Sequence, residues 1–90
     1  MQTNLHPLAQ VREVLGKSQQ VFATDLALST RTVSAVEAHT YSATPWSLID
    51  ALSKHFALSL DTARAICDAS ITEADLAHVL RALRAKGGKR

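Results

Sequence analysis

The chain has 90 residues, enough for one domain and too few for two, and a formal net charge of +2. Its composition, 47% hydrophobic but only 4% aromatic, predicts a helical domain whose core is built from Leu, Val, Ile and Ala. A single cysteine, Cys67, excludes a disulfide framework, the histidines lack metal-ligand spacing, and no apolar run is long enough for a bilayer, so we expect a cytoplasmic protein with no metal, cofactor or membrane partner.

Three helices are predicted in the first half of the chain from apolar spacing and from residues that begin or end a helix. Pro7 suits the first turn of a helix over 7–15, which Gly16 can terminate. Ser18 is a good N-cap for a second helix that continues through Leu26, and Ser29 is a good N-cap for a third helix of about nine residues.

The helical pattern continues in the second half. Thr44 and Pro45 form an N-cap and first-turn pair for a fourth helix, a fifth follows over 60–69, and Thr72 with Asp75 forms a capping-box-like pair at the start of a sixth, over 72–86. No alternating run is long enough for a strand, and we expect no internal repeat. The sequence therefore predicts an all-α domain of five to six helices over 1–85, followed by a flexible basic tail over 86–90.

The register of residues 18–37 is more specific than the helices themselves. This stretch reads S-Q-x-x-F-A-x-x-L-A-L-S-x-x-T-V-S-x-V-E. It resembles the helix-turn-helix of the lambda-repressor-like family, the Cro and XRE-type bacterial and phage regulators, and a looser match covers residues 8–67. The resemblance implies a compact lambda-repressor-like domain whose second and third helices form the helix-turn-helix. Ala27 departs from the family's usual glycine, at a left-handed turn position that costs other residues about 1 kcal/mol or more.

Two charged residues fall on predicted inner faces of helices. Arg12 shares the apolar face of the first helix with Leu8 and Val11, and Glu37 lies four residues after Val33. Buried charges need partners, so we expect Arg12 and Glu37 to form a structural ion pair that ties the first helix to the third. The alternative is that Arg12 extends its charged end into solvent.

The outer face of the third helix carries short polar groups and no acid, as a helix that faces base edges and phosphates in the major groove requires. Arg31 is the candidate for a bidentate contact to guanine, and Thr30 and Ser34 are candidates for bonds to bases or phosphates. Ala35 could meet a thymine methyl group, and Ser29 could reach a phosphate in addition to capping the helix.

Further phosphate contacts are predicted at the edges of this surface. The family resemblance adds Gln19, which would bind a phosphate through its side chain or the adjacent amide. His39 is a candidate phosphate contact, with plain exposure as the alternative. Tyr41 and Trp46 could touch the sugar-phosphate backbone, although Trp46 could equally pack beneath the fourth helix.

These residues predict a sequence-specific DNA-binding transcriptional regulator, a repressor of phage, plasmid or mobile-element type, whose partner is double-stranded operator DNA. The alternative is a protein-interaction module with the same fold, such as an antitoxin that holds a toxin. Residues 1–80 carry five basic and eight acidic side chains, which weakens the first hypothesis because phosphate contacts dominate affinity for DNA. No nucleophile, base or carboxylate cluster has a recognisable catalytic spacing, so we do not expect an enzyme.

The C-terminal part raises two further expectations. Leu76, Val79, Leu80 and Leu83 form an apolar stripe on the sixth helix that exceeds what one neighbouring helix covers, so we expect a homodimer, with packing on the chain's own core as the alternative. The five basic residues over 81–90 either follow DNA phosphates as a mobile arm or only complement the helix end and solubilise the chain.

Overall fold

Every regular element that the computed structural model describes, over residues 6–38 and 45–87, is an α-helix. The helices are α1 (Pro7–Val14), α2 (Gln19–Asp25), α3 (Thr30–Glu37), α4 (Trp46–Phe56), α5 (Leu60–Cys67) and α6 (Glu73–Gly87). The predicted all-α domain of five to six helices is confirmed. Within the same two ranges, none of the helices combines the length and apolar character needed to cross a membrane.

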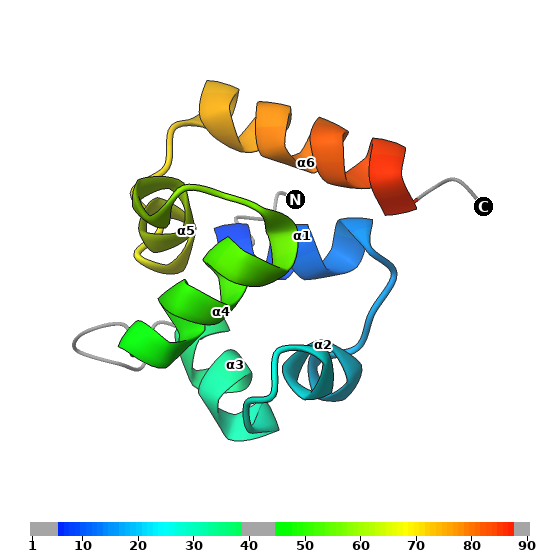
Figure 1. Cartoon of the computed structure of the whole chain (residues 1–90), viewed down its shortest axis with the longest axis vertical. Coiled ribbons are helices and arrows are strands. Elements are labelled where there is room, and N and C mark those ends of the chain that lie inside the picture. Colours follow the sequence, from blue (N-terminus) through cyan, green and yellow to red (C-terminus); the bar gives the residue numbers. More distant parts are fainter. Residues whose placement is uncertain (1–5, 39–44, 88–90) are drawn as a thin grey trace.

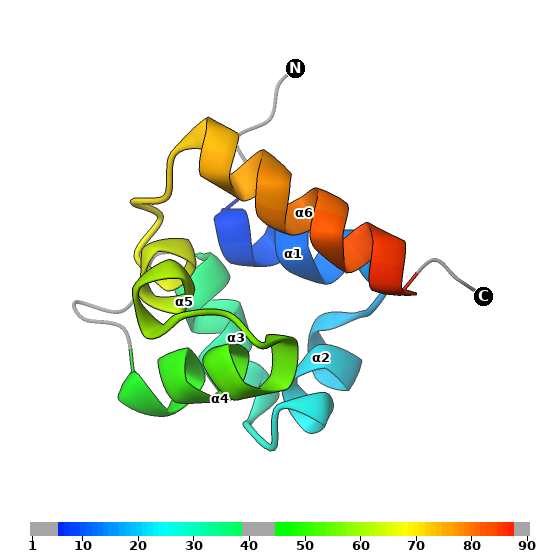
Figure 2. The same cartoon turned by 45° about the horizontal axis from the view of Figure 1, so that its top comes forward.

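Helix α1 lies at the centre of the arrangement. It contacts α3, α5 and α6, whereas α2 packs mainly against α3 and α4 packs against α5. In Figures 1 and 2, α6 lies along one side of α1 and the α2–α3 pair lies on the other. The C-terminal helix is therefore separated from the α2–α3 pair by α1.

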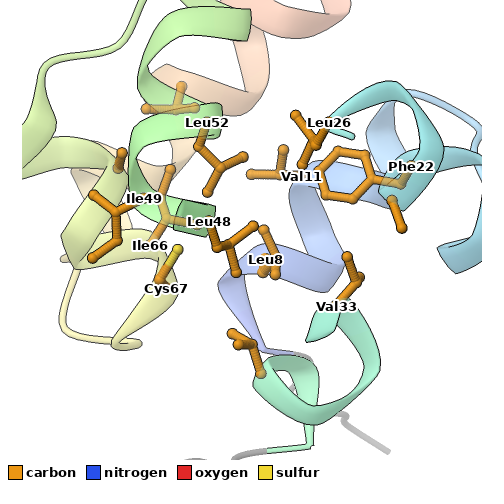
Figure 3. Close-up of a cluster of buried hydrophobic side chains, with 14 of the residues drawn as sticks. Leu8, Val11, Phe22, Leu26, Val33, Leu48, Ile49, Leu52, Ile66 and Cys67 are labelled. Atoms are coloured by element: carbon orange, nitrogen blue, oxygen red, sulfur yellow. The ribbon is translucent and has the colours of Figure 1, made fainter. Parts of the chain in front are cut away.

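Among the described residues the buried core is aliphatic around Phe22, on which the partly buried Phe56 stacks with ring centroids 6.1 Å apart. Figure 3 shows Val11 of α1 facing Phe22 of α2 and Leu26, the residue that follows α2, and Leu8 of α1 facing Leu48 of α4. The largest fully buried side chains come from the first five helices: Phe22, Leu8, Leu48, Leu52, Ile66, Val11 and Val33. Their burial, at about 25 cal/mol per Å² of apolar surface, is what holds these short helices together.

Serine and threonine hydroxyls begin four of the helices. Each accepts a hydrogen bond from the backbone N–H three residues later: Ser18 from Val21 at 3.1 Å, Ser29 from Thr32 at 3.2 Å, Ser59 from Thr62 at 3.1 Å and Thr72 from Asp75 at 3.1 Å. Each bond satisfies one of the amides that a helix leaves unpaired at its start. The caps predicted at Ser18, Ser29 and Thr72 are confirmed.

Three helices end near an alanine whose backbone is left-handed. The φ angles are 60° at Ala27, 55° at Ala57 and 60° at Ala69. After each, the next N–H bonds back to the last turn: Leu28 to the Ala23 carbonyl at 2.8 Å, Leu58 to Ser53 at 3.0 Å and Ser70 to Ala65 at 2.9 Å. Glycine is the usual residue at such a position. The left-handed turn expected at Ala27 is present, and among the described residues Ala57, Ala69 and Gly16, the last with a φ of 70°, are left-handed as well.

The α4–α5 turn repeats the α2–α3 turn, contrary to the expectation of no internal repeat. Residues 26–36, LALSTRTVSAV, align with residues 56–66, FALSLDTARAI. In both, a left-handed alanine precedes a capping serine, whose hydroxyl lies 2.9 Å from a threonine hydroxyl. Because the repeat covers only a turn and the helix after it, the chain as a whole shows no periodicity. The outer faces differ, with Leu60 and Asp61 in place of Thr30 and Arg31.

Several helix ends differ from the predictions by one or two residues. Helix α1 ends at Val14, α2 ends at Asp25, and α6 runs over Glu73–Gly87. Helix α4 begins at Trp46 with Pro45 at its N-cap and no side-chain cap, while Thr44 lies outside the described residues. Helix α5 ends at Cys67, two residues before the predicted end, because the backbone becomes left-handed at Ala69.

The apolar stripe of α6 is covered by the chain's own core. Leu76, Val79 and Leu83 are only 8%, 7% and 4% exposed, and Leu80 packs against the same cluster. The prediction that this stripe exceeds what its neighbours cover is therefore wrong, since α1 lies along it. A homodimer remains a prediction, but α6 supplies no argument for it.

Candidate nucleic-acid interface

The α2–α3 pair is a helix-turn-helix held by a small set of buried side chains. Phe22 and Ala23 of α2 are each 1% exposed, and Val33 and Val36 of α3 are also buried. The turn between the helices is fixed by the left-handed Ala27. Because one face of each helix is buried and the turn is closed by hydrogen bonds, the outer face of α3 is presented by a rigid support.

The outer face of α3 carries the predicted contact residues. Thr30 and Arg31 are exposed, and Ser34 and Ala35 are half-buried on the same helix. Among the described residues, Arg31 forms no hydrogen bond or ion pair. Its five N–H donors are therefore available to a ligand, in a geometry that suits bidentate acceptors.

Ser29 is already engaged within the protein. Its hydroxyl accepts from the Thr32 amide and lies 2.9 Å from the Thr32 hydroxyl. The cap role is thus the one the structure records for Ser29. The hydroxyl remains exposed at the start of α3, where the helix dipole favours an anion.

The predicted ion pair between α1 and α3 is present. Arg12 Nε lies 2.8 Å from Glu37 Oε2 and Arg12 Nη2 lies 3.1 Å from Glu37 Oε1, a bidentate pair. The two side chains are 15% and 8% exposed, and Arg12 Nη1 also donates to the Lys17 carbonyl at 2.9 Å. The hydrogen bond from Arg12 to Glu37 raises the pKa of Arg12 above its ordinary value, against the opposing effect of burial.

Glu37 has a second partner that sequence reasoning missed. The carboxamide Nε2 of Gln19 donates to Glu37 Oε1 at 2.9 Å. Gln19 is the first residue of α2 and Glu37 the last of α3, so the bond joins the two ends of the helix-turn-helix. The spacing of residues along the sequence does not predict this contact, because the contact depends on the angle at which the two helices cross.

An open hollow of about 320 Å³ lies beside this network. Its lining includes His6 and Arg12 from the α1 region, Gln19 from α2, and Ser34 and Glu37 from α3. His6 is 5% exposed, and its Nδ1 caps α1 by accepting from the Leu8 amide at 3.0 Å. Candidate residues Gln19 and Ser34 therefore border the same hollow between α1, α2 and α3.

Acidic side chains near α3 are neutralised by ion pairs. Asp25, at the end of α2, pairs with Lys17, and Glu37 pairs with Arg12. The acids that form no ion pair within the described ranges lie on α5 and α6: Asp61, Glu73 and Asp75. The excess negative charge is thus carried by helices other than the helix-turn-helix.

The remaining predicted contacts divide into two groups. His39 and Tyr41 lie outside the described residues. Trp46 is 59% exposed at the start of α4, so it does not pack beneath that helix.

The described residues also bear on two other kinds of chemistry, a metal site and a reactive thiol. Their His, Cys, Asp and Glu side chains form no group of three that could hold a metal ion. Cys67 is buried in the core, and burial, with a smaller effect of Asp68, raises its pKa to about 12. A thiol so protonated is not a nucleophile near neutral pH.

Comparison of the chain with protein-family models, curated proteins and solved structures finds no match.

Proposed function

We propose that this chain is a sequence-specific DNA-binding transcriptional regulator, a repressor of phage, plasmid or mobile-element type that acts in the cytoplasm. In this proposal α3 enters the major groove of a duplex operator. The observation that carries it is Arg31, exposed and without a partner among the described residues, on the outer face of a rigidly supported α3. An exposed arginine between short hydroxyl side chains presents donors that match the acceptors of base edges.

Each side chain of this face has a chemical role in the proposal. Arg31 would donate two hydrogen bonds to the O6 and N7 of a guanine, and Thr30 and Ser34 would bond bases or phosphates. Ala35 would meet a thymine methyl group. Gln19 and Ser29, at the starts of α2 and α3, would bind phosphates and fix the register of the domain on the duplex.

The distribution of charge supports this orientation. Asp25 and Glu37 are both neutralised by ion pairs, so no unpaired described acid lies on α2 or α3. The net negative charge of residues 1–80 should therefore repel DNA less than its total suggests. At physiological salt, screening weakens the repulsion between DNA and charges that lie more than about 8 Å from it.

A homodimer belongs to the same proposal. Two copies related by a two-fold axis would place their α3 helices in successive major grooves, about 34 to 36 Å apart, on a palindromic operator.

The test is a titration of labelled genomic fragments from the protein's own locus at low salt. We expect a shift with the unmodified chain and a loss of about 1 to 3 kcal/mol with Arg31→Ala, together with relaxed preference at one base pair. Arg64→Ala, which removes an exposed arginine of α5 that pairs with Asp68, is the matched control and should bind normally. A uniform loss at all operator positions would instead make Arg31 a phosphate contact.

The alternative function is a protein-interaction module with the same fold, such as an antitoxin that binds a toxin. The acidic excess of residues 1–80, five basic against eight acidic side chains, favours it, because phosphate contacts dominate affinity for DNA. If neither the unmodified chain nor Arg31→Ala shifts any fragment at low salt, this alternative replaces the regulator.

A further inference from the structure

The bond between Gln19 and Glu37 defines how the Gln19 carboxamide is oriented. An ionised carboxylate accepts hydrogen bonds and donates none, so the amide group that faces Glu37 must be the NH₂ and not the carbonyl oxygen. The 2.9 Å distance between Gln19 Nε2 and Glu37 Oε1 agrees with this assignment. One of the two Nε2 hydrogens is used, and the second has no acceptor within the described residues.

The carboxylate is itself held in place. Arg12 donates to both oxygens of Glu37, and a third Arg12 hydrogen bond to the Lys17 carbonyl fixes the guanidinium. Both side chains are largely buried, which limits their rotation. The orientation of Gln19 is therefore set by a chain of hydrogen bonds that begins in α1 and passes through the last residue of α3.

The electrostatics of the hollow allow an anion to approach this amide. Glu37 alone would repel a phosphate, but the guanidinium of Arg12 compensates its charge at 2.8 Å. Gln19, Ser34 and Glu37 border the same open hollow, so a phosphate oxygen has room beside the second Nε2 hydrogen.

We infer that Glu37 is a positioning residue for DNA binding, which holds the Gln19 carboxamide so that its second Nε2 hydrogen donates to a phosphate of the duplex. The inference rests on the proposed function and extends the role of Glu37 beyond the ion pair. A fixed donor avoids the loss of side-chain entropy that a free glutamine would suffer on binding.

The test compares Gln19→Ala, Glu37→Gln and the double variant in binding to the same operator. Gln19→Ala should lower affinity about tenfold on every duplex, since one hydrogen bond to a charged group is lost. The slope of log affinity against log salt should not change, because a neutral amide releases no counterion. Gln20→Ala, which alters the next residue of α2, is the matched control and should bind normally.

The double variant separates positioning from stability. In the unmodified chain Glu37 Oε1 accepts from both Arg12 Nη2 and Gln19 Nε2, and Oε2 accepts from Arg12 Nε. The carboxamide introduced by Glu37→Gln would keep an acceptor for Gln19 only by turning its own NH₂ toward Arg12 Nε, which places two donors against each other; in the opposite orientation that NH₂ would face Gln19. Glu37→Gln should then weaken binding about tenfold in the unmodified background but less than twofold in the Gln19→Ala background. An equal effect in both backgrounds would show that Glu37 acts only through folding, and would overturn the inference.

A measurement on the unmodified chain covers the case in which Glu37→Gln does not fold. In NMR spectra of the free protein, one side-chain Nε2 hydrogen of Gln19 should exchange with solvent more slowly than those of Gln20, and the other should shift when operator is added. Equal exchange for Gln19 and Gln20 would overturn the inference alone. A chain that binds no duplex at all would overturn the proposed function and the inference with it.

Discussion

Replacing the left-handed alanines with glycine should stabilise the protein. Ala27, Ala57 and Ala69 have φ angles of 55° to 60°, a region in which the Cβ atom approaches the following carbonyl oxygen at a cost of about 1 to 2 kcal/mol. Glycine has no Cβ and avoids this cost, but it also makes the unfolded chain more flexible, which offsets about 0.4 to 1 kcal/mol. The expected net gain in the free energy of unfolding is about 0.5 to 1 kcal/mol at each site.

The three gains should add, because the three turns are separate and share no partner. A triple variant should then gain about 2 kcal/mol, and since 1 kcal/mol shifts the midpoint of a domain of this size by about 4 to 8 °C, its Tm should rise by about 10 °C. Thermal unfolding followed by far-UV circular dichroism, with urea unfolding to give the free energies, measures both quantities.

The control for this series is Ala77→Gly, on the exposed face of α6. Here the backbone is helical, so glycine should cost about 1 kcal/mol. If the glycine variants at the three turns lose as much stability as Ala77→Gly, the left-handed alanines carry no strain and the reasoning fails.

Four further outcomes are expected. Glu37→Ala should cost about 3 kcal/mol of unfolding free energy by depriving the largely buried Arg12 of its bidentate carboxylate, whereas Lys54→Ala, at an exposed pair, should cost less than about 0.5 kcal/mol; equal urea midpoints would contradict this. The Cys67 thiol has an ordinary pKa of 9.0 and a pKa of about 12 in the folded chain, so the folded chain binds this proton more tightly than the unfolded chain. The free energy of unfolding should therefore decrease above about pH 9, by about 1.4 kcal/mol at pH 10. In urea unfolding at the same pH values, Cys67→Ala should not show this decrease. A chain that ends at Ala85 should bind every duplex more weakly and with a shallower salt slope, and an unchanged slope would show that the basic tail takes no part in the interface. Sedimentation with a palindromic operator should show two copies per duplex, and one copy at tens of micromolar protein would remove the dimer.

Much of the local structure follows from the sequence because its causes lie within a few residues. The caps at Ser18 and Ser29 are predictable since a capping hydroxyl reaches only three residues along the chain. The ion pair between Arg12 and Glu37 is predictable for a different reason. Each charge falls on an apolar helix face, and a buried charge requires a partner of opposite sign.

The tertiary structure decides what depends on how the helices cross. It buries the apolar stripe of α6 against the chain's own core, whereas the sequence suggests that part of this stripe is left over for a dimer contact. The sequence cannot decide this, because the surface that a neighbouring helix covers depends on its distance and crossing angle. It leaves Trp46 exposed, and it brings Gln19 within hydrogen-bond distance of Glu37, which lies 18 positions later in the chain. Apart from buried charges, which require a partner of opposite sign, side chains on different helices are brought together by packing that fixes the helix axes, and spacing along the chain does not specify that packing.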